Sequence, residues 1–198
     1  MYSKFLKRFF DIVISSVGLI VLSPLFLIIS ILIKASDGGP VFYRAPRIGK
    51  DCKKIYMYKF RTMKVNAEDI RNKDGSTFNA KDDPRVTRIG KILRETSLDE
   101  LAQMINMFRG EMSLIGPRPS TWDRLPSYQS DELDKMKVRP GITGYTQAYF
   151  RNSLSLREKR LKDAWYANHV SFWLDVKIVF KTIQTVLLRK NLYTNTKA

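Results

Sequence analysis

The chain has 198 residues, of which 44% are hydrophobic and 12% aromatic, and this apolar content excludes a mainly disordered protein. Lysine and arginine total 35 against 19 acidic residues, so the formal net charge of +16 favours anionic partners such as nucleic acid, lipid head groups or phosphorylated substrates. A single cysteine, Cys52, excludes an internal disulfide framework, and a single histidine, His169, argues against a histidine-based zinc site or a Ser-His-Asp triad.

The N-terminal segment is strongly apolar, because Asp11 is the one ionisable residue between Phe9 and Ile33. As one straight helix these residues would measure roughly 37 Å, against about 30 Å of bilayer hydrocarbon, so their length permits a membrane span. A signal peptide fits poorly, since the apolar run is too long and no small-residue cleavage motif closes it.

Ser23 and Pro24 interrupt this segment near its middle. Proline leaves the carbonyl of Ile20 without its helical donor, a break that costs about 3 kcal/mol inside a helix, and the Ser23 hydroxyl is available to that carbonyl. Basic residues flank both ends of the segment, which favours keeping both ends on the cytoplasmic side. These flanking residues are Lys4, Lys7, Arg8, Lys34, Arg44 and Arg47. Two hypotheses remain open, a kinked spanning helix and a re-entrant helix that returns to the same face.

Residues 41–63 predict a β-hairpin, with two short strands around a polar turn near Lys50 to Lys53. In the second strand, aromatic residues alternate with Met57, Lys59 and Arg61, which predicts aromatic side chains on one face and cations on the other. These cations are candidates for phosphate binding or for simple solvation.

The sequence LRETSLDELAQMINMF, residues 93–108, carries the most informative acids. Ser97 followed by Glu100 has the pattern of a capping box and predicts a helix that begins at Leu98. Asp99 and Glu100 would then lie in its first turn, where the helix dipole stabilises negative charge. Two interpretations remain open: the acids only cap the helix, or, with Arg94 upstream to receive a phosphate, they ligate a hard cation or attack phosphorus. The residues expected to face inward are Leu101, Ala102, Ile105 and Phe108.

Two loops, 116–119 (GPRP) and 137–144 (KVRPGITG), each place an arginine beside proline. Proline restricts the backbone around Arg118 and Arg139, so each guanidinium is aimed at low entropic cost. Either loop alone indicates a rigid turn with a surface arginine. The candidate cations for a diphosphate are Arg118 and Arg139 together with Lys59, Arg61 and Arg94.

Residues 171–190 predict an amphipathic helix. Its apolar side carries Phe172, Val176, Val179, Phe180, Ile183 and Leu187. Such a helix packs on a core or lies in the lipid interface. The tryptophan, phenylalanine and basic residues, together with the apolar N-terminal segment, favour the interface.

These motifs together resemble the bacterial sugar transferases, the monotopic phosphoglycosyl transferases that start surface-glycan assembly. The matching motifs are KRFFD, the Ser-Pro break, YKFRTM, TSLDEL, GEMSLIGPRP and VRPGITG, in family order from about Lys7 to Asp175. The resemblance implies transfer of a sugar phosphate from a nucleoside-diphosphate sugar, usually a UDP-sugar, to polyprenol (undecaprenyl) phosphate, with release of the nucleoside monophosphate. It also implies Mg²⁺ dependence and a re-entrant helix kinked at Ser23-Pro24.

By this resemblance, Asp99 is the nucleophile that forms a phosphosugar intermediate. Glu100 corresponds to the adjacent catalytic acid, acting in metal ligation or proton handling, so Asp99 and Glu100 are the expected Mg²⁺ ligands. Arg94 and Arg118 would hold phosphate oxygens. Asp163 matches a family acidic position without a clear role. The chain departs from the family pattern at Tyr149 and Phe150 and after the double proline, so the donor sugar does not carry over.

We therefore expect a mainly α protein with a small β-hairpin (α+β). Residues 1–36 would form the re-entrant membrane helix and residues 37–198 the catalytic domain, at the cytoplasmic face of the bacterial inner membrane. The expected partners are a UDP-sugar, polyprenol phosphate, anionic lipids and, in a homodimer, a second copy; these anions account for the charge without nucleic acid. The alternatives are a membrane-anchored binder of nucleic acid or acidic polymer, and a non-catalytic pathway scaffold.

Overall fold

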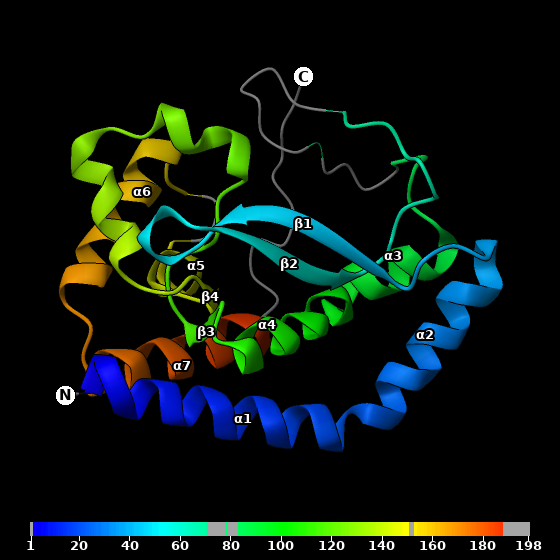
Figure 1. The fold of residues 1–198 in the computed structure, drawn as a ribbon, viewed down its shortest axis with the longest axis horizontal. Coiled ribbons are helices and arrows are strands. Elements are labelled where there is room, and N and C mark those ends of the chain that lie inside the picture. The colour runs from blue at the N-terminus through cyan, green and yellow to red at the C-terminus, as the bar shows by residue number, and fades with distance from the viewer. Residues whose placement is uncertain (1, 71–77, 79–82, 151–152, 188–198) are drawn as a thin grey trace.

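The computed structural model describes residues 2–70, 78, 83–150 and 153–187, and confirms a mainly helical fold with small sheets (Figure 1). The α-helices are α1 (Lys7–Val21), α2 (Ser23–Asp37), α3 (Arg88–Glu95), α4 (Gln103–Arg109), α5 (Tyr145–Tyr149), α6 (Leu156–Asn168) and α7 (Phe172–Leu187). The strands are β1 (Phe42–Ile48), β2 (Lys54–Phe60), β3 (Ser113–Ile115) and β4 (Gly141–Thr143). A π-helical turn covers Tyr2–Leu6, and 3₁₀ helices cover Lys50–Cys52, Leu98–Ala102, Trp122–Ser127 and Ser130–Lys137.

Helices α1 and α2 form a bent pair along one edge of the molecule, with a bend of 62° between them (Figure 1). The break lies at the predicted place, and the Ser23 hydroxyl donates to the carbonyl of Ile20 at 2.8 Å. This bond satisfies the acceptor that Pro24 leaves open, as expected. Within the described residues no single helix is long and apolar enough to cross a membrane, whereas α1 and α2 together pass that test of length and composition.

One side of α1 is packed into the rest of the fold. The buried Asp11 carboxylate accepts hydrogen bonds from the Leu114 amide at 2.8 Å and the Ser113 hydroxyl at 3.0 Å, which joins the helix to β3. The opposite side of the bent pair leaves large apolar side chains exposed. They include Phe9, Val13, Val17, Ile20, Val21, Leu27, Ile28 and Ile31.

The hairpin of β1 and β2 is antiparallel, as predicted, and its register pairs Phe42 with Phe60 and Ile48 with Lys54. Alternation along the strands places Lys59, Met57 and Arg47 on one face. On the other face Phe60 is buried and packs edge-on against Phe26 of α2. The hairpin thus joins α2 on one side to the candidate site on the other.

Strands β3 and β4 pair in parallel and bring the two arginine-proline loops together. The Gly116 amide donates to the Thr143 carbonyl, and the Gly141 amide donates to the Pro117 carbonyl, both at 2.9 Å. Glycine is required here, because a Cβ on Gly141 would lie 2.1 Å from the Gly116 nitrogen. Loops 116–119 and 137–144 therefore run side by side.

The predicted capping box at Ser97 is wrong. Ser97 adopts a left-handed conformation (φ 58°) directly after α3, and its side chain caps no amide. The chain then forms the 3₁₀ helix Leu98–Ala102 before α4, so its buried face rotates away from the one expected of an α-helix. Phe108, expected inside, is 50% exposed. The buried side chains of this segment are Asp99, Ala102, Gln103, Asn106 and Met107.

Helix α7 confirms the predicted amphipathic helix over Phe172–Leu187; residues 188–190 lie outside the described residues. Ile178 and Asp175 are buried against the core, and the Tyr166 hydroxyl donates to Asp175 at 2.6 Å. On the outer side, large apolar side chains are exposed among the described residues 172–185. They are Phe172, Trp173, Phe180 and Ile183.

Candidate active site

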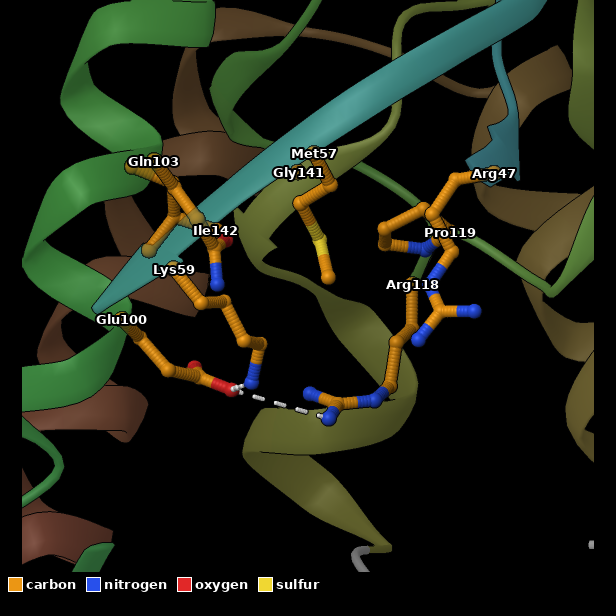
Figure 2. A pocket seen from close by; sticks show the side chains of 9 residues that line it. All are labelled: Arg47, Met57, Lys59, Glu100, Gln103, Arg118, Pro119, Gly141 and Ile142. Atoms are coloured by element: carbon orange, nitrogen blue, oxygen red, sulfur yellow. Dashed lines mark hydrogen bonds and ion pairs between the residues drawn. The ribbon is translucent and has the colours of Figure 1, made fainter. Parts of the chain in front are cut away.

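A pocket lies against the face of the hairpin that carries Lys59 (Figure 2). It encloses about 330 Å³, part of which is open to solvent. The hairpin, the Leu98–Ala102 turn, α4 and both arginine-proline loops contribute to it. Its lining residues are Arg47, Met57, Lys59, Glu100, Gln103, Arg118, Pro119, Gly141 and Ile142.

Lys59 connects the two adjacent acids. Its ammonium lies 2.7 Å from Glu100 Oε1 and 3.5 Å from Asp99 Oδ2. The Arg118 guanidinium approaches the same Glu100 oxygen at 3.8 Å (Figure 2). Asp99 is not itself a lining residue, and its side chain is 12% exposed. The structure thus brings together four of the predicted site residues.

The two acids differ in their ionisation. Burial raises the pKa of the Asp99 carboxyl above its ordinary value, while the positive charges of Lys59 and Arg94 act in the opposite direction. Burial alone would also raise the pKa of Glu100, but the charges of Lys59 and Arg118 lower it to about 2. Glu100 is therefore a permanent anion at neutral pH. Asp99 is a poorly solvated carboxylate, a state in which an oxygen nucleophile is more basic.

Arg94 does not line the pocket, but its positive charge acts on Asp99. Its guanidinium donates to the Thr62 hydroxyl at 2.9 Å, and burial lowers the pKa of Arg94. Because its charge acts on Asp99, its contribution to the site is electrostatic.

The structure does not bring Arg61 or Arg139 into the pocket. Arg61 follows the end of β2, is buried, and forms a double ion pair with Asp37 at the end of α2. Arg139 donates to the Gly110 carbonyl at 2.7 Å, beside the C-terminal end of α4. Both guanidinium groups satisfy protein acceptors, so their positions give the predicted phosphate-binding roles no support.

Asp163 lies beneath the Arg118 loop and is almost fully buried. It accepts from the Thr146 hydroxyl at 2.8 Å and from the Lys135 ammonium at 3.3 Å. Lys135 also donates to the Arg118 carbonyl at 3.2 Å. Burial raises the pKa of Asp163, and Lys135 opposes this effect. No clear role for Asp163 was predicted from the sequence, and the geometry makes it a support for the Arg118 backbone.

The chemistry of the donor set fits Mg²⁺. The described residues contain no cluster of three or more histidine, cysteine or acidic side chains. Magnesium, however, is commonly held by one or two carboxylates together with substrate phosphates. Asp99 and Glu100 provide two carboxylates close enough to share one lysine ammonium, so the pair is able to share a divalent cation.

Sequence reasoning missed Arg47 and Gln103 as pocket residues. Gln103 hydrogen-bonds to Glu100, three residues earlier, and the threefold period of a 3₁₀ helix places these two positions on one face. Arg47 lies on the same face of the hairpin as Lys59 because it pairs with Ile55. This position could have been predicted from the sequence once the exact turn residues were known. Neither Tyr149 nor Phe150 contributes to the lining; Tyr149 packs instead on Tyr145, with ring centroids 5.1 Å apart.

Comparisons with known proteins show what the chain as a whole is similar to. A family model described as bacterial sugar transferase matches residues 2–189. The chain is 42% identical to the exopolysaccharide production protein ExoY of Rhizobium meliloti, over 94% of the chain and 88% of that protein. It is 39% identical to the undecaprenyl-phosphate galactose phosphotransferase of Salmonella typhimurium, over 96% of the chain. It is 40% identical to the UDP-glucose:undecaprenyl-phosphate glucose-1-phosphate transferase of Klebsiella pneumoniae, over 94% of the chain. The chain spans only 42% and 41% of the length of these last two proteins.

Proposed function

The chain belongs to the bacterial sugar transferase family, and we propose that it transfers a sugar 1-phosphate from a UDP-sugar to polyprenol phosphate and releases UMP. The names of the Salmonella and Klebsiella relatives describe sugar phosphate transfer to undecaprenyl phosphate by those proteins. The observation that carries the proposal is the cluster of Asp99, Lys59, Glu100 and Arg118 around one pocket.

In this mechanism an Asp99 carboxylate oxygen attacks the phosphorus that bears the sugar. A new oxygen–phosphorus bond forms, the bond to the UMP oxygen breaks, and its electron pair leaves with UMP. An oxygen of polyprenol phosphate then attacks the same phosphorus, and the Asp99 carboxylate departs unchanged. Covalent catalysis suits a site that receives first a water-soluble donor and then a lipid acceptor.

The surrounding residues prepare this attack. Burial raises the free energy of the Asp99 anion and with it the pKa of this carboxyl, while the positive charges of Lys59 and Arg94 act in the opposite direction. Lys59 and Arg118 line the pocket and are placed to bind phosphate oxygens. Because Glu100 is ionised throughout the working pH range, we assign it to metal ligation rather than proton transfer.

Glu100, with Asp99, is the proposed holder of Mg²⁺. Bound there, the metal would supply positive charge to the diphosphate and to the departing monophosphate. Lys59 contacts both of these carboxylates and also lines the pocket, so its ammonium is placed to contribute positive charge beside the substrate phosphates.

We further propose that α1 and α2 enter the cytoplasmic leaflet of the bacterial inner membrane and return to the same face, with residues 37–198 on the cytoplasmic side. The 62° bend, the Ser23 bond to Ile20 and the exposed apolar side of the pair support this arrangement. The exposed face of α7 would lie in the lipid interface. Trp173, which is 70% exposed on this face, would then contact lipid. The net positive charge favours binding to anionic lipids.

Cysteine labelling tests this topology. In a Cys52→Ser background, Ser3→Cys and Tyr43→Cys place exposed thiols before α1 and after α2. We expect a membrane-impermeant maleimide to label neither thiol in intact spheroplasts and both after lysis. Labelling of one thiol and protection of the other in intact spheroplasts would show a spanning helix and contradict the re-entrant proposal.

The activity is tested by incubating purified protein with polyprenol phosphate, Mg²⁺ and a panel of UDP-sugars. We expect UMP release with at least one donor, dependent on the lipid acceptor for multiple turnovers. Failure of every donor to yield UMP, by a protein that binds to membranes normally, would contradict the proposed function.

A further inference from the structure

The two ends of the pocket carry different charges. At one end Glu100 contacts Lys59, which also reaches Asp99. At the other end Arg47 lies beside Pro119 and the Arg118 backbone (Figure 2). Of the described lining residues, Arg47 is the one cationic side chain that sequence reasoning did not consider for binding phosphate.

The hairpin register fixes the separation of its two cations. Arg47 lies opposite Ile55, four residues before Lys59 on the same face of β2. At about 3.3 Å per residue, their backbone positions are about 13 Å apart along the strand. Met57 lies between Arg47 and Lys59, and the Arg118 side chain extends from loop 116–119 toward Glu100 (Figure 2). This arrangement provides cations along an extended substrate rather than around a single phosphate.

The geometry of displacement at phosphorus determines which end of the pocket would receive the leaving nucleotide. The attacking and leaving oxygens lie roughly in line on opposite sides of the phosphorus. If Asp99 attacks from the Lys59 end, the leaving nucleotide must point away from it, toward the end that holds Arg47. We infer that Arg47 binds the phosphate of the departing UMP and so sets the orientation of the donor. This inference rests on the proposed function and adds to it a residue and a binding polarity.

The backbone around Arg47 is well suited to this task. Arg47 pairs with Ile55 on one side and forms an antiparallel bridge with Thr121 on the other. The next amide, of Ile48, donates to the Ser120 carbonyl at 2.9 Å. Arg47 is half-buried and its backbone is held between two neighbouring segments, so it would lose less conformational entropy on binding a ligand than a loop residue would. Its guanidinium is able to bind one phosphate through two hydrogen bonds.

Calorimetric binding of UMP in the presence of Mg²⁺, combined with initial rates, tests this inference. We expect Arg47→Met to weaken UMP binding and to raise KM for the UDP-sugar at least tenfold, with a smaller change in kcat at saturating donor. Arg44→Met is the matched control, because Arg44 is on the same strand, is exposed, and faces the other side of the hairpin. It should leave both quantities within twofold of the wild type.

Arg47→Lys separates binding from folding, since it keeps the charge and the aliphatic stem but loses the two-pronged geometry. We expect it to recover part of the UMP affinity. Wild-type UMP affinity in Arg47→Met, or a fall in kcat and melting temperature without a change in UMP affinity, would overturn the inference. A wild-type protein that turns over no donor would instead contradict the proposed function.

Discussion

Two of the buried aspartates among the described residues, Asp99 and Asp163, are each paired with a lysine, yet their surroundings differ. Asp163 and Lys135 have side chains only 4% and 5% exposed, and the two Asp163 oxygens separately accept from Lys135 and Thr146. Asp99 is more open, and its lysine lies closer to Glu100, at 2.7 Å, than to Asp99, at 3.5 Å. Burial raises the pKa of both aspartates.

The difference shows how similar ion pairs serve structure and chemistry. The Asp163 pair is closed, and Lys135 uses its remaining hydrogen-bonding capacity to hold the Arg118 carbonyl. The Asp99 pair borders a pocket, and its lysine is shared by two acids. The more open aspartate suits the bond to substrate that we propose, whereas the closed pair supports the Arg118 loop, for which we propose phosphate binding.

Substitution of Asp99 should have the largest effect on activity. Asp99→Asn removes the attacking carboxylate, and we expect turnover to fall by about a thousandfold or more. The free energy of unfolding should change by less than about 1 kcal/mol at neutral pH, because Glu100 still neutralises Lys59 and the amide is not a buried charge. UMP release and thermal denaturation of the same preparation measure both quantities. Turnover within tenfold of the wild type would contradict a nucleophilic role.

Substitution of Asp163 should have its main effect on stability. Asp163→Asn leaves the Lys135 charge buried without its counter-ion, and we expect a loss of about 3–5 kcal/mol in the free energy of unfolding. Chemical denaturation in detergent measures this loss. The control is the double variant Lys135→Met with Asp163→Leu, which removes both charges and should recover much of the stability. Equal stabilities for Asp163→Asn and Asp99→Asn would remove the distinction between the two pairs.

Substitution of Lys59 should shift the pH dependence of activity. Burial raises the pKa of Asp99, so this carboxylate should become protonated at a higher pH than an ordinary carboxyl group does. Because the ionised form is the proposed nucleophile, kcat/KM should fall as the pH is lowered through that range. Lys59 lowers this pKa, so Lys59→Met should move the acidic limb to higher pH. Lys54→Met, at the exposed far end of the same strand, is the control and should leave the limb unchanged. An acidic limb at the same or lower pH in Lys59→Met would contradict the assignment.

Features with a local signal were predicted from the sequence. The hairpin, the break at Pro24 and helix α7 each follow from residue types at a regular spacing or from one proline. The pairing of Asp99 and Glu100 with Lys59 could be expected only as part of a family pattern, since 40 residues separate Lys59 from Asp99.

Features set by distant contacts were not predicted. Arg61 looked equivalent to Lys59 in the alternating pattern, but β2 ends at Phe60 and Arg61 turns toward Asp37. Ser97 looked like a helix cap, but the chain arrives there directly from α3 and adopts a positive φ. Sequence periodicity contains no information on either event, because each depends on where a neighbouring element ends.

Trapping the covalent bond between Asp99 and the sugar phosphate tests the nucleophilic role that we propose for Asp99. Wild-type protein is mixed with Mg²⁺ and a radiolabelled UDP-sugar without polyprenol phosphate, then quenched and digested. We expect at most one UMP released per protein molecule and a phosphosugar on the peptide that contains Asp99. This adduct should disappear when the acceptor is added. Glycolipid formation at the full rate without any adduct at Asp99, or an adduct that persists in Asp99→Asn, would contradict the nucleophilic role.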